Sequence, residues 1–449
     1  MSDERRLFWL RAEYKRDEAR TPLVPAAAAS LVEAGHEVVV ESSTQRAIRI
    51  EDYVAAGCGT AEAGAWREAP ARALVLGLKE LDASLGPFRH RHVHFAHAFK
   101  HQSGWRETVD AFAAGGGVLF DLEYLVDEEG RRVAAFGYWA GFVGAALGLL
   151  ALARQRAGEA SPLGALEPWP DAAALTSTVS EALAASAPPA DEQNRDAEHP
   201  GDESAADRGI VGEGVAVGNV AATDAGVVGT SPRVLIIGAR GRSGRGARAL
   251  CEACGVDATL WDIDETAAGG PFDAVREHEL LLNCVFVGDP IPPFTTRGHL
   301  ERDGRRLGVI VDVSCDPFGK ANPLPLYEAP TTMAEPTVRL VQPVDEEPPL
   351  DLVAIDHLPS LLPLESSEDF SAQLLPALLD FEDEPAGVWA RAAAAFEKAL
   401  LEAGIDAGRD VSGLPPGLDA ALVAGSVPTG GDVDDDGASG ESDVIGTRT

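Results

Sequence analysis

The stretch V-L-I-I-G-A-R-G-R-S-G-R-G, from Val234 to Gly246, decides the fold of this chain. Its first four residues form a short, continuous apolar run, which is typical of a strand buried in a parallel sheet. Gly238, Gly241 and Gly244 follow at once in a G-x-x-G-x-x-G turn, and a segment of helical length comes next. Strand, glycine turn and helix in this order predict a Rossmann-like α/β unit.

The same stretch has the chemistry of a dinucleotide site. A pyrophosphate can approach free backbone N–H groups at a helix N-terminus if no side chain blocks the turn. A second strand, Ala258 to Trp261, leads to Asp262, eighteen residues after Gly244. A carboxylate there can accept hydrogen bonds from ribose hydroxyls and would repel a 2′-phosphate, so we expect NAD rather than NADP. The alternative is a plain strand-to-helix turn.

The composition is strongly acidic, with 72 Asp and Glu against 37 Lys and Arg in 449 residues and a formal net charge of −35. Such a charge argues against nucleic acid and anionic membranes as partners. Only five of the basic residues are lysines, a pattern that resembles a salt-adapted, halophilic proteome. In such a chain, Lys79 and Lys100 are candidates for an amine that can lose its proton, which arginine cannot do.

The five cysteines are few and odd in number, which favours a reduced cytoplasmic protein over a disulfide scaffold. The pair Cys251 and Cys254 falls in the helix after the glycine turn, where we expect apolar side chains rather than a metal or redox site. The first residues lead into no apolar run typical of a signal peptide, so we do not expect one. The apolar run from Trp139 to Ala153 is too short and glycine-rich for a membrane span and predicts a buried helix.

Residues 7 to 140 alternate strand-like and helical segments, which predicts a second doubly wound unit. The carboxyl ends of parallel strands line the ligand crevice, so polar residues just after the strands should share one rim. Lys79 and Glu80 follow the strand at 74–78, His97 follows the strand at 93–96, and Glu123 follows the strand at 118–121.

We therefore expect two Rossmann-like domains with the active site in the cleft between them. The expected substrate domain is discontinuous, made of residues 1–138 and 357–424, and the NAD-binding domain spans 139–356. An acidic insertion at 188–231 interrupts the second domain, and 425–449 is predicted to be a disordered acidic tail.

Lys79 is the sharpest candidate for catalysis. To act as a general base its amine must shed a proton near the working pH, through burial or a neighbouring cation. Glu80 and Glu123 would oppose this, and an ordinary surface ion pair with Glu80 is the alternative.

His97 is the better acid-base candidate among the histidines, because it lies at a strand end. The alternation of His92 and His94 with apolar residues indicates a solvated or inter-domain face rather than a metal site. Four cations could share the rim and suit a substrate with several carboxylates. They are Arg20, Lys100, Arg131 and Arg132.

Blocks along nearly the whole chain resemble NAD-dependent saccharopine dehydrogenases of the lysine-forming type. They include L-R-A-E from Leu10, G-L-K-E from Gly77, H-F-A-H from His94, W-D-I-D-E-T from Trp261 and I-D-H-L-P-S-L-L-P from Ile355. The resemblance implies a fold shared with alanine dehydrogenase and transhydrogenase. It also implies reversible oxidation of saccharopine by NAD to L-lysine and 2-oxoglutarate, through hydride transfer and imine hydrolysis, within lysine biosynthesis.

The resemblance assigns roles to individual residues. Lys79 would deprotonate the secondary amine, His97 would serve imine hydrolysis, and Glu80 and Glu123 would tune the site. The implied substrate contacts are Arg20, Lys100, Gly104, Arg132 and Phe136. Besides Gly238 and Gly244 of the turn, the implied cofactor contacts are Arg131, Gly241, Arg242, Asp262, Thr266, Phe286, Val313, Ile355, Asp356, His357 and Leu358.

One departure from the family pattern is Ser243, which stands where the family can carry a cysteine near Cys284, so no disulfide is expected there. Two alternative functions stay open. One is an alanine-type or other opine-type amino-acid dehydrogenase that uses NAD, and the other is a non-catalytic NAD-binding regulator. We expect a monomer that binds small molecules and no metal.

Overall fold

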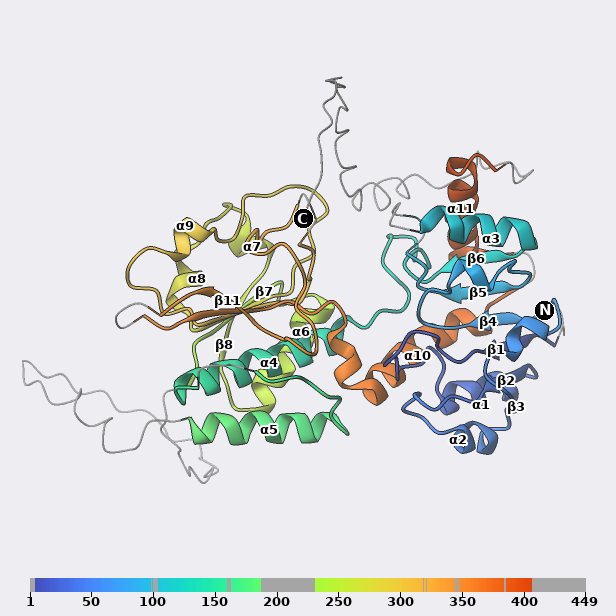
Figure 1. Cartoon of the computed structure of the whole chain (residues 1–449), viewed down its shortest axis with the longest axis horizontal. Coiled ribbons are helices and arrows are strands. Elements are labelled where there is room, and N and C mark those ends of the chain that lie inside the picture. Colours follow the sequence, from blue (N-terminus) through green and yellow to red (C-terminus); the bar gives the residue numbers. More distant parts are fainter. Residues whose placement is uncertain are drawn as a thin grey trace, which may run out of the picture.

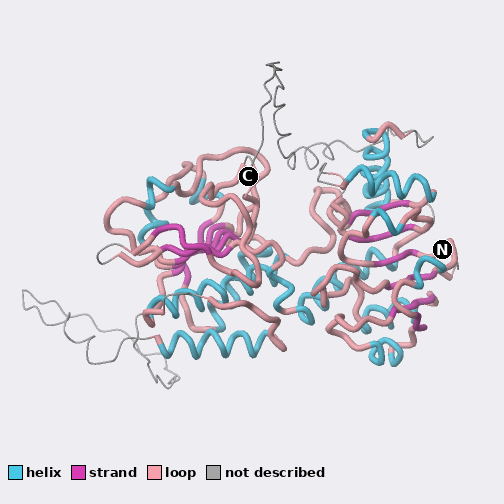
Figure 2. The backbone as a smooth tube through the Cα atoms, in the orientation of Figure 1, coloured by secondary structure: helices cyan, strands magenta, loops and turns pink. Residues whose placement is uncertain are grey.

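The computed structural model describes residues 5–97, 99, 104–159, 163–186, 231–317, 319, 321–343, 347–382 and 385–405. Within these ranges the chain forms two α/β lobes side by side, each built around a six-stranded sheet (Figures 1 and 2). The fold class predicted from the sequence is confirmed. Residues 188–230 of the expected insertion and the whole expected tail, 425–449, lie outside the described residues.

The first sheet is parallel and has the strand order β3-β2-β1-β4-β5-β6. The order reverses between β1 and β4, and ligands of such sheets bind outside the carboxyl ends of the strands at this reversal. Lys79 follows β4 directly. The strands are β1 (Leu7–Leu10), β2 (Glu37–Glu41), β3 (Gly59–Ala61), β4 (Leu74–Leu76), β5 (Arg91–His94) and β6 (Val118–Asp121).

Helices cover both faces of the first sheet. Phe370 of α10 packs with Phe8 on one face, whereas Phe112 of α3 and Phe396 of α11 pack together on the other. Helices α10 and α11 come from the C-terminal part of the chain, so this lobe is discontinuous (Figure 1). The helical elements are α1 (Pro25–Glu33), α2 (Ile50–Ala55), η1 (Ala65–Glu68), η2 (Ala83–Leu85), α3 (Trp105–Gly115), α10 (Pro363–Leu379) and α11 (Gly387–Glu402).

The second sheet has the order β11-β12-β10-β9-β7-β8, parallel except for β11 at one edge. Its order reverses between β7 and β9, and the glycine turn follows β7, so the turn opens at the place where ligands bind. The strands are β7 (Val234–Ile237), β8 (Ala258–Trp261), β9 (Leu280–Asn283), β10 (Val309–Asp312), β11 (Val338–Val341) and β12 (Leu350–Val353).

The apolar run predicted to be a buried helix is α4 (Gly137–Arg156), which lies against α6. Its glycines permit this close contact, because a Cβ added at Gly141 would meet the Ser243 carbonyl oxygen at 1.7 Å. Among the described helices α4 is long and apolar enough to cross a membrane, but it is mostly buried in the lobe. The other helices of this lobe are α5 (Ala172–Ala185), α6 (Arg242–Ala253), α7 (Ile263–Thr266), α8 (Asp273–Glu277), α9 (Arg297–Leu300) and η3 (Leu358–Leu361).

The prediction for the histidine-rich strand was wrong in two respects. The strand β5 spans 91–94 rather than 93–96, because Arg91 already pairs with Leu74 and Val118 in the sheet. His92 and His94 are 0% and 1% exposed, not solvated, since β5 lies inside the sheet with helices on both faces. Burial lowers the pKa of both imidazoles well below the usual range, so they pack as neutral rings.

Candidate active site

A cavity of about 380 Å³ lies between the two lobes. Its walls are made by residues that follow β4, β5 and β6 of the first sheet and β9, β10 and β12 of the second, together with the start of α6. The carboxyl ends of both sheets therefore open into one cleft. The titratable residues that line it are Arg20, Lys79, His97, Glu123, Arg132, Arg242, Cys284, Asp356 and His357.

The backbone that carries Lys79 is clamped by residues just after β1. Both carboxylate oxygens of Glu13 accept hydrogen bonds, from the backbone N–H of Leu78 at 2.7 Å and of Lys79 at 3.1 Å. Arg11, buried in the lobe, pairs with Glu13 at 3.1 Å and also donates to the Lys79 carbonyl. Arg11 and Glu13 fall within the L-R-A-E block, but sequence pattern does not predict the clamp, because it depends on the pairing of β1 with β4.

The environment of Lys79 favours its neutral amine. Burial lowers the pKa of Lys79, and the charge of Arg20 lowers it further, against the opposing effect of Glu18. Glu80 also opposes the shift, but it forms its ion pair with Lys15, at 3.2 Å, rather than with Lys79. Lys79 can therefore serve as a base closer to neutral pH than an exposed lysine could.

Arg20 is held rigidly at the cleft wall. Its guanidinium makes a two-pronged contact with Glu18, at 2.8 and 2.6 Å, and both side chains are at most 4% exposed. The guanidinium also lies 4.5 Å from the ring centroid of Phe136, which stacks on Phe370 at 4.4 Å. Arg20 keeps the pKa of Glu18 lowered although burial alone would raise it. This fixed cation suits a substrate carboxylate.

His97 and Glu123 meet at the far end of the same rim, with 4.0 Å between Nδ1 and Oε2. The carboxylate of Asp121, at the end of β6, accepts hydrogen bonds from Ala96 N at 3.3 Å and Glu123 N at 2.9 Å. Asp121 thereby ties the loop after β5 to the loop after β6. His97 itself has a positive φ of 53°, which turns the chain after the strand.

The glycine turn has the shape that a dinucleotide needs. Gly238 has a φ of +87°, and a Cβ at Gly244 would lie 2.1 Å from the Gly238 carbonyl oxygen, so side chains are excluded. Gly241 is the N-cap of α6, and a Cβ there would also be tight, at 3.3 Å from the Gly238 carbonyl oxygen. The backbone there can approach a pyrophosphate at the helix N-terminus. These residues therefore fit NAD.

Asp262, the residue expected to bind the ribose, is hydrogen-bonded to the glycine turn. Its carboxylate accepts hydrogen bonds from the backbone N–H of Arg240 at 2.8 Å and of Ile263 at 3.0 Å. Thr266, on α7, donates to the Asp262 carbonyl at 2.8 Å. The acid thus lies beside the glycine turn, as the spacing in the sequence predicts.

Asp312, the last residue of β10, connects the ends of β9 and β10. It accepts hydrogen bonds from Asn283 Nδ2 at 2.9 Å and Tyr327 Oη at 2.7 Å, and burial raises its pKa. Asn283 also reaches Ser314 at 3.3 Å, so the cleft residues after β9 and β10 are connected. Sequence pattern does not predict this network, because it depends on the pairing of β9 with β10.

Half of the expected site residues line the cleft, and the others that the structure describes do not. Ile355 and Leu358 are buried in the core of the second lobe, and Gly104 is the N-cap of α3. The expected residues that also lie outside the cleft lining are Glu80, Gly238, Gly241, Gly244, Asp262 and Thr266. Arg131 is exposed and pairs with Asp127 and Glu129, each at 2.9 Å. Lys100 lies outside the described residues. Within the described ranges, no cluster of three or more His, Cys, Asp or Glu could hold a metal ion.

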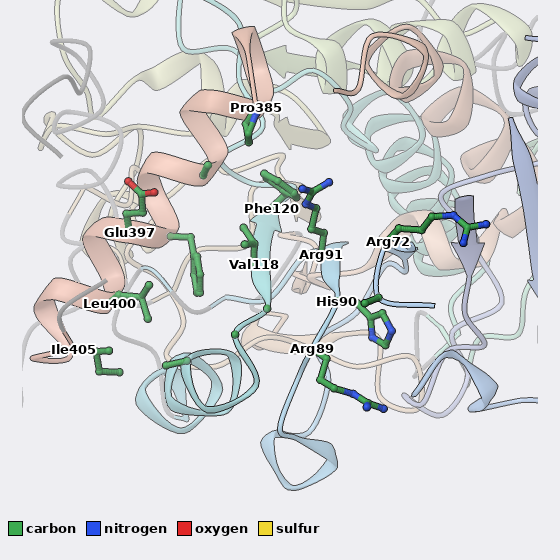
Figure 3. Close-up of a pocket in the computed structure, with 16 residues that line it drawn as sticks. Arg72, Arg89, His90, Arg91, Val118, Phe120, Pro385, Glu397, Leu400 and Ile405 are labelled. Atoms are coloured by element: carbon green, nitrogen blue, oxygen red, sulfur yellow. The ribbon is translucent and has the colours of Figure 1, made fainter. Parts of the chain in front are cut away.

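A larger cavity, about 670 Å³, lies at the opposite edge of the first sheet, between the starts of β5 and β6 and helix α11 (Figure 3). Figure 3 shows its three arginine side chains pointing in different directions. Arg72 pairs with Glu37 at 3.4 Å, and Arg89 donates to the Arg67 carbonyl at 2.7 Å. Size alone therefore does not identify the active site, whereas the converging titratable groups of the smaller cleft do.

Comparisons with known proteins agree with this geometry. Residues 9–143 match the family model of the alanine dehydrogenase/PNT N-terminal domain. An L-alanine dehydrogenase structure superposes with a TM-score of 0.58 at 17% identity, over 88% of this chain and 99% of that one. A transhydrogenase from Sinorhizobium meliloti gives 0.50 at 14% identity, over 83% and 92%. At such identities the likeness shows the fold.

Relatives with similar sequences identify the family more narrowly than these fold likenesses do. Saccharopine dehydrogenase [NAD(+), L-lysine-forming] of Schizosaccharomyces pombe is 39% identical over 87% of this chain and 97% of its own length. The protein of the same name from Emericella nidulans is 40% identical over 87% and 96%. Identity at this level over almost the whole length of both relatives establishes that the chain belongs to the family of NAD-dependent, lysine-forming saccharopine dehydrogenases, oxidoreductases that act on a CH–NH group.

Proposed function

We propose that this chain catalyses the reversible, NAD-dependent conversion of saccharopine to L-lysine and 2-oxoglutarate. The observation that carries the proposal is the cleft itself, in which Lys79 with its lowered pKa and the fixed cation Arg20 share one cavity with Arg242 and Ser243, the first residues of α6 after the glycine turn. The reaction needs a base for a secondary amine, cations for carboxylates and a site for a dinucleotide. The cleft offers all three.

The residues of the first lobe would handle the substrate. Arg20 and Arg132 would bind carboxylates of saccharopine, with contributions from Lys100, Gly104 and Phe136. Lys79 would take the proton from the secondary amine, which makes the nitrogen lone pair available to the carbon that loses hydride. His97, next to Glu123, would exchange protons with water and with the departing lysine amine during imine hydrolysis.

The residues of the second lobe would hold NAD, which when bound supplies the hydride acceptor. The backbone of Gly238, Gly241 and Gly244 would cradle the pyrophosphate, and Asp262 would bind the ribose. The nicotinamide end would lie along the cleft. The residues that would contact it there are Arg242, Phe286, Val313, Asp356 and His357.

The two lobes would act as two domains, residues 1–138 with 357–424 and residues 139–356. We also propose that the protein works as a monomer in the cytoplasm and serves lysine biosynthesis. Its elution volume on a calibrated gel-filtration column, at several protein concentrations, tests the monomer.

A substrate comparison tests the proposed reaction. Purified protein is given NAD with saccharopine, with alanine, or with an opine that has a shorter amino-acid side chain, and NADH and free lysine are measured. We expect NADH and lysine in equal amounts from saccharopine and little NADH from the others. Turnover of alanine alone would contradict the substrate assignment, and NAD binding without turnover of any of them would indicate a regulator.

A further inference from the structure

We propose that Asp264 restrains Arg240 from binding the 2′-phosphate of NADP, so that the NAD site contains a phosphate-binding arginine held out of use. The inference rests on the proposed use of NAD and concerns how the site rejects the phosphorylated cofactor. It adds to Asp262 a second residue that determines cofactor specificity.

The position of Arg240 within the glycine turn places it beside the ribose site. Its backbone N–H donates to the Asp262 carboxylate at 2.8 Å, and that carboxylate is the group expected to meet the ribose hydroxyls. The Cα of Arg240 is therefore a direct neighbour of the ribose acid. An arginine near this acid is the residue that accommodates the 2′-phosphate in NADP-binding Rossmann sites.

The side chain of Arg240 is engaged elsewhere. Its Nη2 lies 2.8 Å from Oδ2 of Asp264, the second residue of α7. Both side chains are exposed, at 66% and 68%, so the guanidinium is free to move if its partner is removed. The hydrogen bond and charge of Asp264 raise the pKa of Arg240, which keeps the pair ionised.

Charge adds to this restraint. Two further carboxylates, from Asp264 and Glu265, lie within three residues of Asp262, the expected ribose acid, and the Glu265 carboxylate accepts a hydrogen bond from Asp262 N at 2.7 Å. A 2′-phosphate carries roughly two negative charges, so this acidic surface would repel it, and the neighbouring cation Arg240 is already paired with Asp264. Removing Asp264 both frees the cation and lowers the repulsion.

The test measures dissociation constants of NAD and NADP for the full chain by calorimetry, without relying on turnover. Asp264→Asn should tighten NADP binding about tenfold at low salt, because one charge is removed and one guanidinium is freed. The affinity for NAD should change less than about twofold, because NAD has no 2′-phosphate for Arg240 to bind. Adding Arg240→Leu to Asp264→Asn should abolish most of the gain for NADP.

Glu252→Gln is the matched control. Glu252 forms an equally exposed pair with Arg248 at 2.6 Å on the neighbouring helix α6, and the substitution removes the same charge. It should leave the ratio of the two dissociation constants unchanged.

Three outcomes would overturn the inference. They are an unchanged NADP affinity in Asp264→Asn, an equal gain in Glu252→Gln, and a gain that survives the addition of Arg240→Leu. The first outcome would show that Asp264 does not restrain Arg240. The second would show that the gain in NADP affinity comes from the change in net charge, and the third that it comes from the loss of local negative charge without Arg240. Failure of the folded wild-type chain to bind NAD would instead refute the proposed function, and it is read from the wild type before any variant is compared.

Discussion

The two walls of the cleft differ in how they would hold the proposed ligands. The cofactor wall would use the backbone at the N-terminus of α6, because the glycine turn before it leaves no room for side chains at Gly238 and Gly244, and the charged side chains of Arg240 and Asp264 lie in solvent. The substrate wall uses buried side-chain charges, with Glu18 and Arg20 at most 4% exposed. Local backbone shape follows from a contiguous motif, whereas the charges around Lys79 come from two loops, the one after β1 that carries Glu18 and Arg20 and the one after β4. The two walls should therefore respond differently to mutation, pH and salt.

The largest effect on stability is expected on the substrate wall. Glu18→Ala leaves the buried Arg20 charge without its partner, which should cost about 3 to 5 kcal/mol in free energy of unfolding. Asp52→Ala removes an exposed partner of Arg49, at 3.4 Å, and should cost less than about 1 kcal/mol. Denaturant unfolding measures both. Equal losses would contradict the distinction between buried and exposed pairs.

On the cofactor wall, a single added methyl group should lower the free energy of unfolding by a similar amount. Gly244→Ala places a Cβ 2.1 Å from the Gly238 carbonyl oxygen, so the turn must deform at a cost of about 3 kcal/mol. NAD affinity should fall at least tenfold as a result. Gly298→Ala, where a Cβ would meet no atom within 4 Å, is the control, and unchanged NAD binding in Gly244→Ala would mean that the turn does not carry the cofactor.

The pH dependence of the reaction should report the charges around Lys79. A general base must be neutral, so the rate with saccharopine should rise with pH up to the pKa of Lys79, which burial and Arg20 lower. The exposed Lys15 also lowers this pKa. Lys15→Met should therefore move the rising limb to higher pH, by less than about one unit. A shift to lower pH, or the same shift in Lys398→Met on α11, would contradict this account.

The smallest expected effect is that of salt on the cofactor wall. The pair of Arg240 and Asp264 is exposed, so raising salt from about 0.1 to 1 M shortens the screening length from roughly 10 to 3 Å. The ratio of the NADP to the NAD dissociation constant should fall a few-fold. The buried pair of Glu18 and Arg20 should hardly respond, whereas the exposed Lys15 is screened, so salt should move the pH profile with saccharopine no further than Lys15→Met does. A larger movement would show that the buried charges of the substrate wall are open to solvent.

The sequence predicted those features that depend on neighbouring residues. The strands at 234–237 and 258–261 and the glycine turn between them could be read directly, because periodicity and glycine spacing are local. Lys79 was found because lysine is scarce and follows an apolar run. Glu13 and Asp121 could not be assigned, since their roles depend on contacts that join the ends of separate strands.

The histidines show the limit of pattern reading. Alternation correctly places His92 and His94 on one face of a strand, but it does not say whether that face meets solvent or helices. Only the order of the sheet decides this, and it places β5 between β4 and β6 under α3 and α11. The edge strand β11 was also missed, because its pairing with β12 depends on residues beyond a long loop.

The central claim is that saccharopine oxidation depends on the amine of Lys79 in this cleft. The most direct test compares NADH formation from saccharopine by the wild type, Lys79→Met and Lys398→Met, with NAD binding measured for each. We predict that Lys79→Met loses at least a hundredfold in rate, typical of a general base, while it still binds NAD and Lys398→Met behaves as the wild type. Undiminished turnover by Lys79→Met would contradict the account.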